Sequence, residues 1–471
     1  MKFNRLAVSM AIAALGAVSS AVSAAPASGV APKYVFYFIG DGMGFHHVVN
    51  ADLYKTRVLG DSASLTMLSF PVASAIRTHS ASSDVTDSAA AGTALATGSK
   101  TRNNMLGMNA DTVAVTSIAR TLFDNGFGVG LITTVGIDDA TPGAFYAHVP
   151  SRHERMTVGR QLAESGYQFA AGAGLAEARD KEGRSTGLLE YFAQQGVKVS
   201  YGPEGLEEVA DRMLVLSHDT VSTWNVGYAI DSIPGALTLP QMTRAAIRHL
   251  SRVSPDRFFL MAEGGSIDHA GHANDGGTIV REVISFDQAI AVAYEFYLAH
   301  PEETLIVVTA DHETGGFSIG NNTTGYAVYP SGVSSQKISK EAFDNYVKSL
   351  ARNRMVYTWD DMKEYLSENL GFWRGVEITP AETAALEEMF SSMMEGRNSA
   401  ADQKTLYASF NAFSAEVFRL LNDKAGYGFT TVKHTGAPVP VFAVGAGAEA
   451  FSSLSDNTDI PARILSLTLG K

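Results

Sequence analysis

Short apolar runs that alternate with helix-forming segments constrain the fold of this chain more than any other feature. Five runs have the length of a strand and are bounded by glycine or polar residues, namely residues 34–40, 128–134, 258–264, 304–312 and 439–447. Continuous apolar composition is typical of parallel strands that are buried on both faces. Segments with helical spacing lie between them, such as residues 281–300. We therefore predict an α/β fold with a doubly wound, mostly parallel central sheet flanked by helices.

The alternation stops between about Asn321 and Thr430. This segment begins turn-rich and continues with helical patterns that contain Met, Trp and Phe. We interpret residues 321–430 as an insertion, or cap subdomain, outside the catalytic core. The main fold then comprises residues 25–320 and residues 431–471, the second part supplying the last strand and a C-terminal helix.

The first 24 residues have the pattern of a secretory signal peptide. Lys2 and Arg5 precede an apolar stretch, and Val22-Ser23-Ala24 forms a small-residue cleavage site. The apolar stretch is shorter than the ~20 residues that a membrane span needs. We expect export to the periplasm or the medium, with no membrane attachment after cleavage.

Net charge and cysteine content limit the partners and the metal ligands that the chain can use. The chain carries 36 basic residues; loss of Lys2 and Arg5 leaves 34 against 49 acidic residues, a net charge of −15. This balance argues against a nucleic-acid partner, which requires a basic face. The chain has no cysteine, so any zinc site must use histidine and carboxylate ligands.

Polar residues gather where the predicted strands end. They are Asp41 after the first strand, Asp138, Asp139, Thr141 and Arg152 after the second, Glu263, Asp268, His269 and His272 after the third, Asp311 and His312 after the fourth, and His434 before the last. In an open α/β sheet, ligands bind beyond the carboxyl ends of the strands. Each residue alone is also explained as a turn or surface residue, but together they predict a metal cluster.

The cluster can be divided by ligand chemistry into three sites. Histidine and carboxylate ligands suit zinc, which gives one site from Asp268, His272 and His434 and another from Asp41, Asp311 and His312. Asp41, Thr141 and Glu263 offer only oxygen, which suits magnesium. We therefore expect two zinc ions and one magnesium ion.

Ser88 follows Asp87 and precedes the small-residue segment "AAAGTALATG", which should form a helix. Serine at such a position is commonly a helix N-cap. It is also a possible nucleophile if a neighbouring group activates it. These residues alone leave both interpretations open.

The motifs "GDGMG", "VTDSAAAGTA", "DDATP", "HVPSR", "EGGSIDHAGH", "TADH" and "HTG" resemble those of alkaline phosphatases, in the order of that family. The resemblance covers roughly residues 33–320 and 430–471. It implies that Ser88 is phosphorylated and bound as an alkoxide by the zinc of Asp41, Asp311 and His312. It also implies that Asp87 orients Arg152, that Arg152 binds phosphate, and that the other zinc activates water. A homodimer is implied as well.

Two positions depart from other members of the family. His269 stands where some relatives carry Lys and others His or Trp, and Asp139 stands where others carry His. The resemblance implies that these two residues tune phosphate affinity and the identity of the third metal. The long insertion resembles those of some marine and cold-adapted bacterial enzymes.

Four other activities are less consistent with the sequence. A phosphodiesterase of the same superfamily would typically use Thr and lack Arg152, and a sulfatase would need a modifiable residue in a C/S-x-P-x-R context. A cofactor-independent phosphomutase fits an export signal poorly. A periplasmic metal- or phosphate-binding protein would use the same ligands without turnover, and an assay with an aryl phosphate distinguishes it.

Overall fold

The computed structural model describes residues 30–218, 224–353, 355–397 and 402–470. The predicted signal peptide, residues 1–24, lies outside the described residues. Among the helices of these ranges, none combines the length and the apolar composition needed to cross a bilayer.

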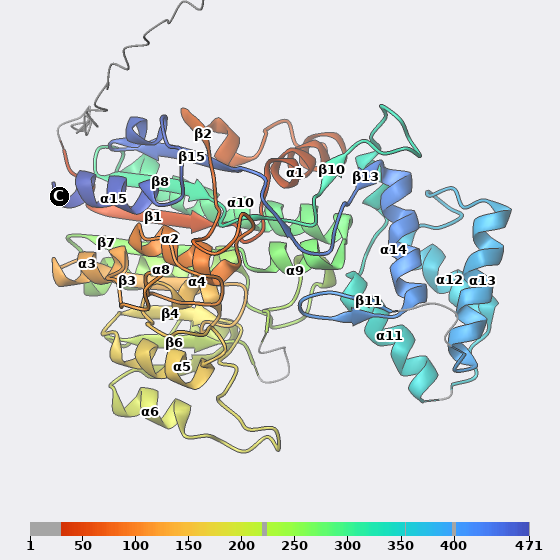
Figure 1. The fold of residues 1–471 in the computed structure, drawn as a ribbon, viewed down its shortest axis with the longest axis horizontal. Coiled ribbons are helices and arrows are strands. Elements are labelled where there is room, and N and C mark those ends of the chain that lie inside the picture. The colour runs from red at the N-terminus through yellow and green to blue at the C-terminus, as the bar shows by residue number, and fades with distance from the viewer. Residues whose placement is uncertain (1–29, 219–223, 354, 398–401, 471) are drawn as a thin grey trace, which may run out of the picture.

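The core of the main fold is a nine-stranded sheet with the order β2-β15-β8-β1-β7-β3-β4-β6-β5 in the described residues (Figure 1). In that order the strands are Val72–Ile76, Val439–Gly445, Thr304–Thr309, Tyr34–Ile39, Phe258–Glu263, Gly128–Thr133, Phe169–Gly172, Met213–Leu216 and Lys198–Tyr201. β1 pairs in parallel with both β7 and β8, and the parallel pairing continues through β3, β4, β6 and β5. The predicted mostly parallel α/β sheet is confirmed.

Helices cover both faces of this sheet. Those of the main fold are α1 (Phe45–Arg57), α2 (Ser88–Thr97), α3 (Ile118–Asp124), α4 (Ala140–Gly143), α5 (Arg155–Glu164), α6 (Leu188–Gln194), α7 (Gly202–Gly205), α8 (Leu239–Val253), α9 (Ser266–Ala273), α10 (Gly276–Ala299) and α15 (Asp459–Leu469). Alternate β1 side chains point to opposite faces. Phe38 packs against Phe286 of α10, with ring centroids 5.9 Å apart, whereas the hydroxyl of Tyr37 donates to the Leu95 carbonyl of α2.

The direction of the last strand differs from the prediction. We expected residues 439–447 to form a parallel strand, but β15 runs antiparallel to both β8 and β2. An apolar run shows that a strand is buried on both faces and carries no information on its direction. The short strands β2, β4, β5 and β6, of four or five residues each, were not predicted.

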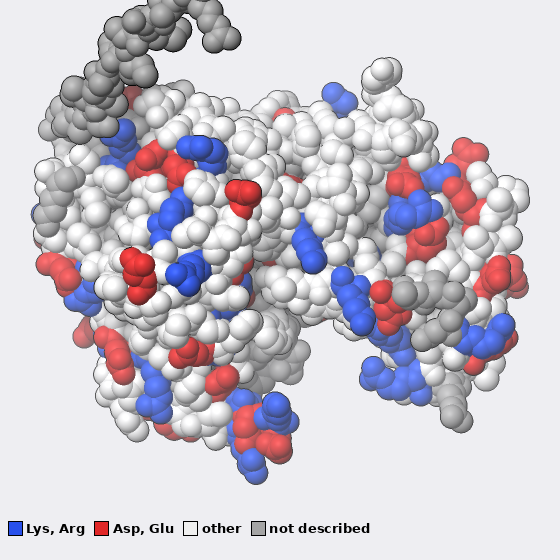
Figure 2. Space-filling model, in the orientation of Figure 1, with Lys and Arg blue, Asp and Glu red and all other residues white. Residues whose placement is uncertain are grey.

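The segment that we interpret as an insertion forms a helical layer beside the sheet (Figure 1). Its helices are α11 (Lys340–Arg352), α12 (Trp359–Leu370), α13 (Pro380–Met394) and α14 (Ala412–Ala425). β10 (Ser318–Ile319) pairs with β13 (Tyr427–Gly428) where the chain leaves and re-enters the main fold. A hairpin of β11 (Gln403–Lys404) and β12 (Ser409–Phe410) extends from this layer toward the main body. Figure 2 shows the surface hollowed between the two parts.

Candidate active site

The carboxyl edge of the sheet carries the predicted ligands because β8, β1 and β7 are adjacent and parallel. Asp41 follows β1, Glu263 ends β7, and Asp311 follows β8. The turn after β1 requires glycine at position 42. Gly42 has a φ of +71°, and a Cβ there would lie 2.8 Å from the Thr314 hydroxyl and 2.9 Å from an Asp268 oxygen. A larger residue would therefore displace the cluster.

The structure brings together Asp41, Asp311 and His312, with one ligand atom of each within 4.8 Å of the others. His312 Nε2 lies 3.5 Å from Asp41 Oδ1 and 3.2 Å from Asp311 Oδ2. The Ser88 hydroxyl lies 3.3 Å from the same nitrogen. The serine hydroxyl therefore lies beside the ligand atoms of this site.

Asp268, His272 and His434 form the second group, again within 4.8 Å of one another. Asp268 and His272 are one turn apart on α9, and His434 is brought to them by the pairing of β14 (His434–Thr435) with β9 (Glu313–Thr314). His272 Nε2 lies 3.0 Å from His434 Nε2 and 3.3 Å from Asp268 Oδ2.

Backbone carbonyls orient both imidazoles. His272 Nδ1 lies 2.6 Å from the Val432 carbonyl, and His434 Nδ1 lies 2.9 Å from the Thr86 carbonyl. If each Nδ1 donates its proton there, each Nε2 is left as a lone pair facing the cluster. Imidazoles that ligate metals are commonly held in this way.

The donor atoms of these groups fit bound cations. Asp41 Oδ1, Asp268 Oδ2, Asp311 Oδ2 and the Thr141 hydroxyl are buried and make no hydrogen bond. Burial and the neighbouring carboxylates of Asp311, Asp268 and Glu263 raise the pKa of Asp41 well above its usual range. Burial raises the pKa of Asp311 to about 7 and that of Glu263 to about 8. Several carboxylates in one buried place are costly unless cations compensate them.

The oxygen-only group consists of Asp41, Thr141 and Glu263. The Thr133 hydroxyl donates to one oxygen of Glu263 at 2.5 Å. The hydroxyl of Thr141, in the first turn of α4, is buried without such a bond. Thr141, Glu263 and Asp41 contribute only oxygen donors, the chemistry that magnesium prefers.

Ser88 is the first residue of α2, and Asp87, not Ser88, caps this helix. Asp87 Oδ1 accepts a hydrogen bond from the Ala90 amide at 3.0 Å, so the N-cap interpretation of Ser88 is wrong. The serine hydroxyl is therefore not engaged as a cap. Ser88 is only 1% exposed, and the N-terminus of α2 favours negative charge beside it.

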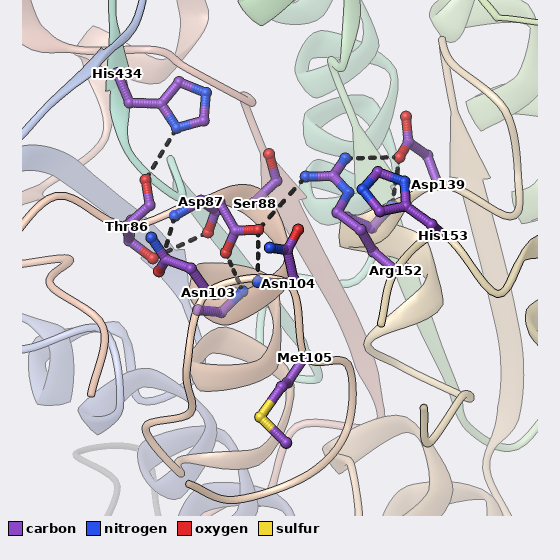
Figure 3. A network of polar contacts seen from close by, with 12 residues as sticks. Thr86, Asp87, Ser88, Asn103, Asn104, Met105, Asp139, Arg152, His153 and His434 are labelled. Atoms are coloured by element: carbon purple, nitrogen blue, oxygen red, sulfur yellow. Dashed lines mark hydrogen bonds and ion pairs between the residues drawn. The ribbon is translucent and has the colours of Figure 1, made fainter. Parts of the chain in front are cut away.

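Arg152 lies beside Ser88 between two carboxylates, Asp87 and Asp139 (Figure 3). Its guanidinium donates to Asp139 Oδ1 at 2.9 Å and approaches Asp87 Oδ2 at 3.8 Å. Although burial opposes it, the carboxylates of Asp139 and Asp87 raise the pKa of Arg152 above its usual range. The arginine is thus a fixed cation within the pocket.

Asp139 is also bound by a second arginine, which the sequence analysis did not identify. Arg155 donates to Asp139 Oδ1 at 2.7 Å and to the carbonyl of Asp138. Burial raises the pKa of Asp139, but Arg155 and Arg152 outweigh burial and hold this pKa well below its usual range.

His269 lies next to Asp268 on α9 and is nearly buried. Its ring packs against Tyr407, with centroids 4.1 Å apart, and Tyr407 also contacts the edge of His272 at 5.2 Å. Tyr407 lies within residues 321–430, which the sequence pattern places outside the catalytic core, and no sequence motif indicates a role for it in the site.

An open α/β sheet whose carboxyl edge holds two histidine–carboxylate clusters, a serine at a helix N-terminus and a buried arginine defines a metal-dependent hydrolase for phosphoryl groups. The family profile described as Alkaline phosphatase matches residues 32–171 and 177–469. The chain belongs to the alkaline phosphatase family and hydrolyses phosphate monoesters. The matched range includes residues 321–430, so the likeness extends through the segment where no motif was recognised.

Relatives agree with this assignment over most of the chain. Alkaline phosphatase 4 of Bacillus subtilis is 30% identical over 441 residues, covering 91% of this chain and 87% of the relative. The structure of a cold-active alkaline phosphatase from a psychrophilic Shewanella species is similar with a TM-score of 0.77 and 26% identity, covering 92% of this chain and 99% of that chain. The structure of Thermus thermophilus alkaline phosphatase is similar with a TM-score of 0.78 and 26% identity, and the match covers 98% of this chain and 96% of that chain.

Proposed function

We propose that this alkaline phosphatase acts through a phosphoserine on Ser88, at a site for two zinc ions and one magnesium ion. The observation that carries the proposal is the position of the Ser88 hydroxyl, 3.3 Å from His312 Nε2 and at the start of α2. Asp41, Asp311 and His312 would hold one zinc, Asp268, His272 and His434 the other, and Asp41, Thr141 and Glu263 the magnesium. When bound, the metals would supply Lewis acids that lower the pKa of the serine hydroxyl and of a water.

The residues of the chain account for the rest of the reaction. Arg152 binds two oxygens of the phosphoryl group with its planar guanidinium, and Asp87 and Asp139 fix its orientation. The Ser88 oxygen forms a bond to phosphorus as the bond to the ester oxygen breaks, and the alcohol leaves with a proton. Water then attacks the phosphoserine, which releases inorganic phosphate and restores the hydroxyl.

Removal of metal is expected to abolish activity reversibly. Protein treated with a chelator should lose turnover of 4-nitrophenyl phosphate at alkaline pH, and two equivalents of zinc with one of magnesium should restore it. Metal analysis of the active protein checks the stoichiometry. Full activity in protein free of zinc would contradict the proposal.

The substitution Asp139→His is expected to change which metal occupies the third site. A histidine at this position adds an imidazole nitrogen, for which zinc competes far better than magnesium. We expect the variant to lose activation by magnesium and to bind a third zinc, as measured by activity and metal content in titrations of metal-free protein. Asp139→Asn, which adds no imidazole, is the matched control. An activity of the native protein that does not respond to magnesium would contradict this assignment.

We also propose that the protein is exported and forms a homodimer. The pattern of residues 1–24 supports cleavage and a periplasmic or secreted enzyme, and the family resemblance supports a homodimer. Acidic and basic side chains are interspersed on the face in Figure 2.

A further inference from the structure

The hairpin β11–β12 places two large side chains at its tip, facing the main body. Thr405 and Ala408 close the turn, with the Thr405 amide donating to the Ala408 carbonyl at 2.8 Å and the Ala408 amide donating to the Thr405 hydroxyl at 3.0 Å. Leu406 and Tyr407 are the two residues between them. Leu406 and Tyr407 are therefore the two central residues of a hydrogen-bonded turn.

The base of the hairpin is tied to the helix that carries metal ligands. Lys340 is almost completely buried, and its ammonium donates to Gln403 of β11 at 2.6 Å and to the Ala273 carbonyl at the end of α9 at 2.8 Å. The same ammonium lies 4.7 Å from the ring centre of Phe410 in β12. Both strands of the hairpin are thus fixed relative to α9, which carries Asp268 and His272.

Leu406 and Tyr407 line the cavity that contains Arg152. This cavity has a volume of about 510 Å³, and its walls include Arg152, His269, Trp224, Leu406 and Tyr407. Such a volume lies in the range of sites that hold a small organic ligand. With the phosphoryl group on Arg152, the remainder of a monoester must occupy the rest of the cavity.

We propose that Tyr407 contacts the leaving group of the bound monoester and favours phosphates of aromatic alcohols, so that the insertion supplies part of the active site. The inference rests on the proposed function. The geometry that supports it is the packing of Tyr407 on His269 at 4.1 Å, within the cavity that Arg152 shares. The two rings are tilted by 44°, and contacts between aromatic rings contribute energy beyond that of burial. Tyr407 is a specificity-determining residue and takes no part in bond making.

The test measures binding without turnover. The zinc- and magnesium-loaded protein is titrated by calorimetry with phenylphosphonate and with methylphosphonate, which share the phosphoryl head and differ in the group beyond it. We expect the native preference for the phenyl compound to fall by about two- to tenfold in Tyr407→Ala and to be kept in Tyr407→Phe. The matched control is Tyr326→Ala, a fully exposed tyrosine of the same insertion, which should keep the native preference.

Bound metal and hydrolysis of 4-nitrophenyl phosphate are measured on the same samples. An unchanged phenyl preference in Tyr407→Ala would overturn the inference, as would an equal weakening of both phosphonates or a loss of bound zinc, since these indicate a structural role for the ring. Tyr407→Leu keeps the bulk of the side chain and is used if the alanine variant does not fold; it should also lower the preference. Failure of the proposed function is distinct, because the native protein would then hydrolyse 4-nitrophenyl phosphate without phosphorylation of Ser88, whatever the phosphonate preference of the Tyr407 variants.

Discussion

Ser88→Ala should lower kcat for 4-nitrophenyl phosphate by ~10³-fold or more and leave two zinc ions bound per chain. Loss of a covalent nucleophile typically removes most of an enzyme's rate enhancement. Zinc should remain because the ligands are carboxylates and imidazoles on other segments, and the hydroxyl of Ser88 is only adjacent to His312. The helix start should also survive, since Asp87 provides the cap. The measurement combines steady-state kinetics with metal analysis.

A trapping experiment checks the covalent step itself. Native protein incubated with labelled phosphate at low pH and then denatured should carry the label on the peptide that contains Ser88, and Ser88→Ala should carry none. Ser452→Ala, a change of an exposed serine far along the chain, is the control for handling and should label normally. Label on any other residue would contradict the assignment of the nucleophile.

The convergence of the candidate ligands could be predicted because the strands that they follow are adjacent and parallel. β1, β7 and β8 end at one edge, so the polar residues that follow them, such as Asp41, Asp268 and His312, must meet there. Both histidine–carboxylate groups expected from the sequence lie within 4.8 Å in the structure. For these residues, the position directly after a strand is enough to predict that they lie close together.

His434 reaches the site because the strand that follows it is antiparallel, whereas the sequence pattern predicts a parallel strand. It lies before the last strand, and the start of a parallel strand would be at the opposite edge of the sheet from the other ligands. Because β15 is antiparallel, its amino end lies at the carboxyl edge of β8. The short pairing of His434 with Thr314 then fixes the imidazole next to His272. Strand direction depends on long-range packing, which the apolar pattern does not contain.

Tyr407 could not be predicted from local patterns. It lies in a short hairpin within a segment without strand–helix alternation, and its contact with His269 spans more than a hundred residues. The contact depends on how the insertion docks, to which the buried Lys340 contributes through hydrogen bonds to Gln403 and Ala273. A tyrosine in a turn has no sequence feature that distinguishes it from a surface residue.

The second large effect is expected for Arg152→Ala, which should lower kcat/KM for phosphate monoesters by roughly 10- to 100-fold, mainly through KM. Loss of a hydrogen bond to a charged group costs about 1.5–3 kcal/mol, which corresponds to roughly 10- to 100-fold, and Arg152 is the buried cation beside Ser88. Inhibition by inorganic phosphate should weaken in parallel, because the product presents the same oxygens. Hydrolysis of a phosphodiester, which offers one charged oxygen fewer, should fall less.

Two further variants separate the charge of Arg152 from its geometry. Arg152→Lys keeps the charge but lacks the fork that binds two oxygens, so its KM should lie between those of the native protein and Arg152→Ala. Arg155→Ala removes the other arginine that binds Asp139 and serves as the matched control, with a smaller change in phosphate inhibition expected. The measurement is the inhibition constant for inorganic phosphate, determined at one pH for the native protein and the three variants. If Arg152→Ala is inhibited as strongly as the native protein, the phosphoryl group is bound by other residues and the role assigned to Arg152 is wrong.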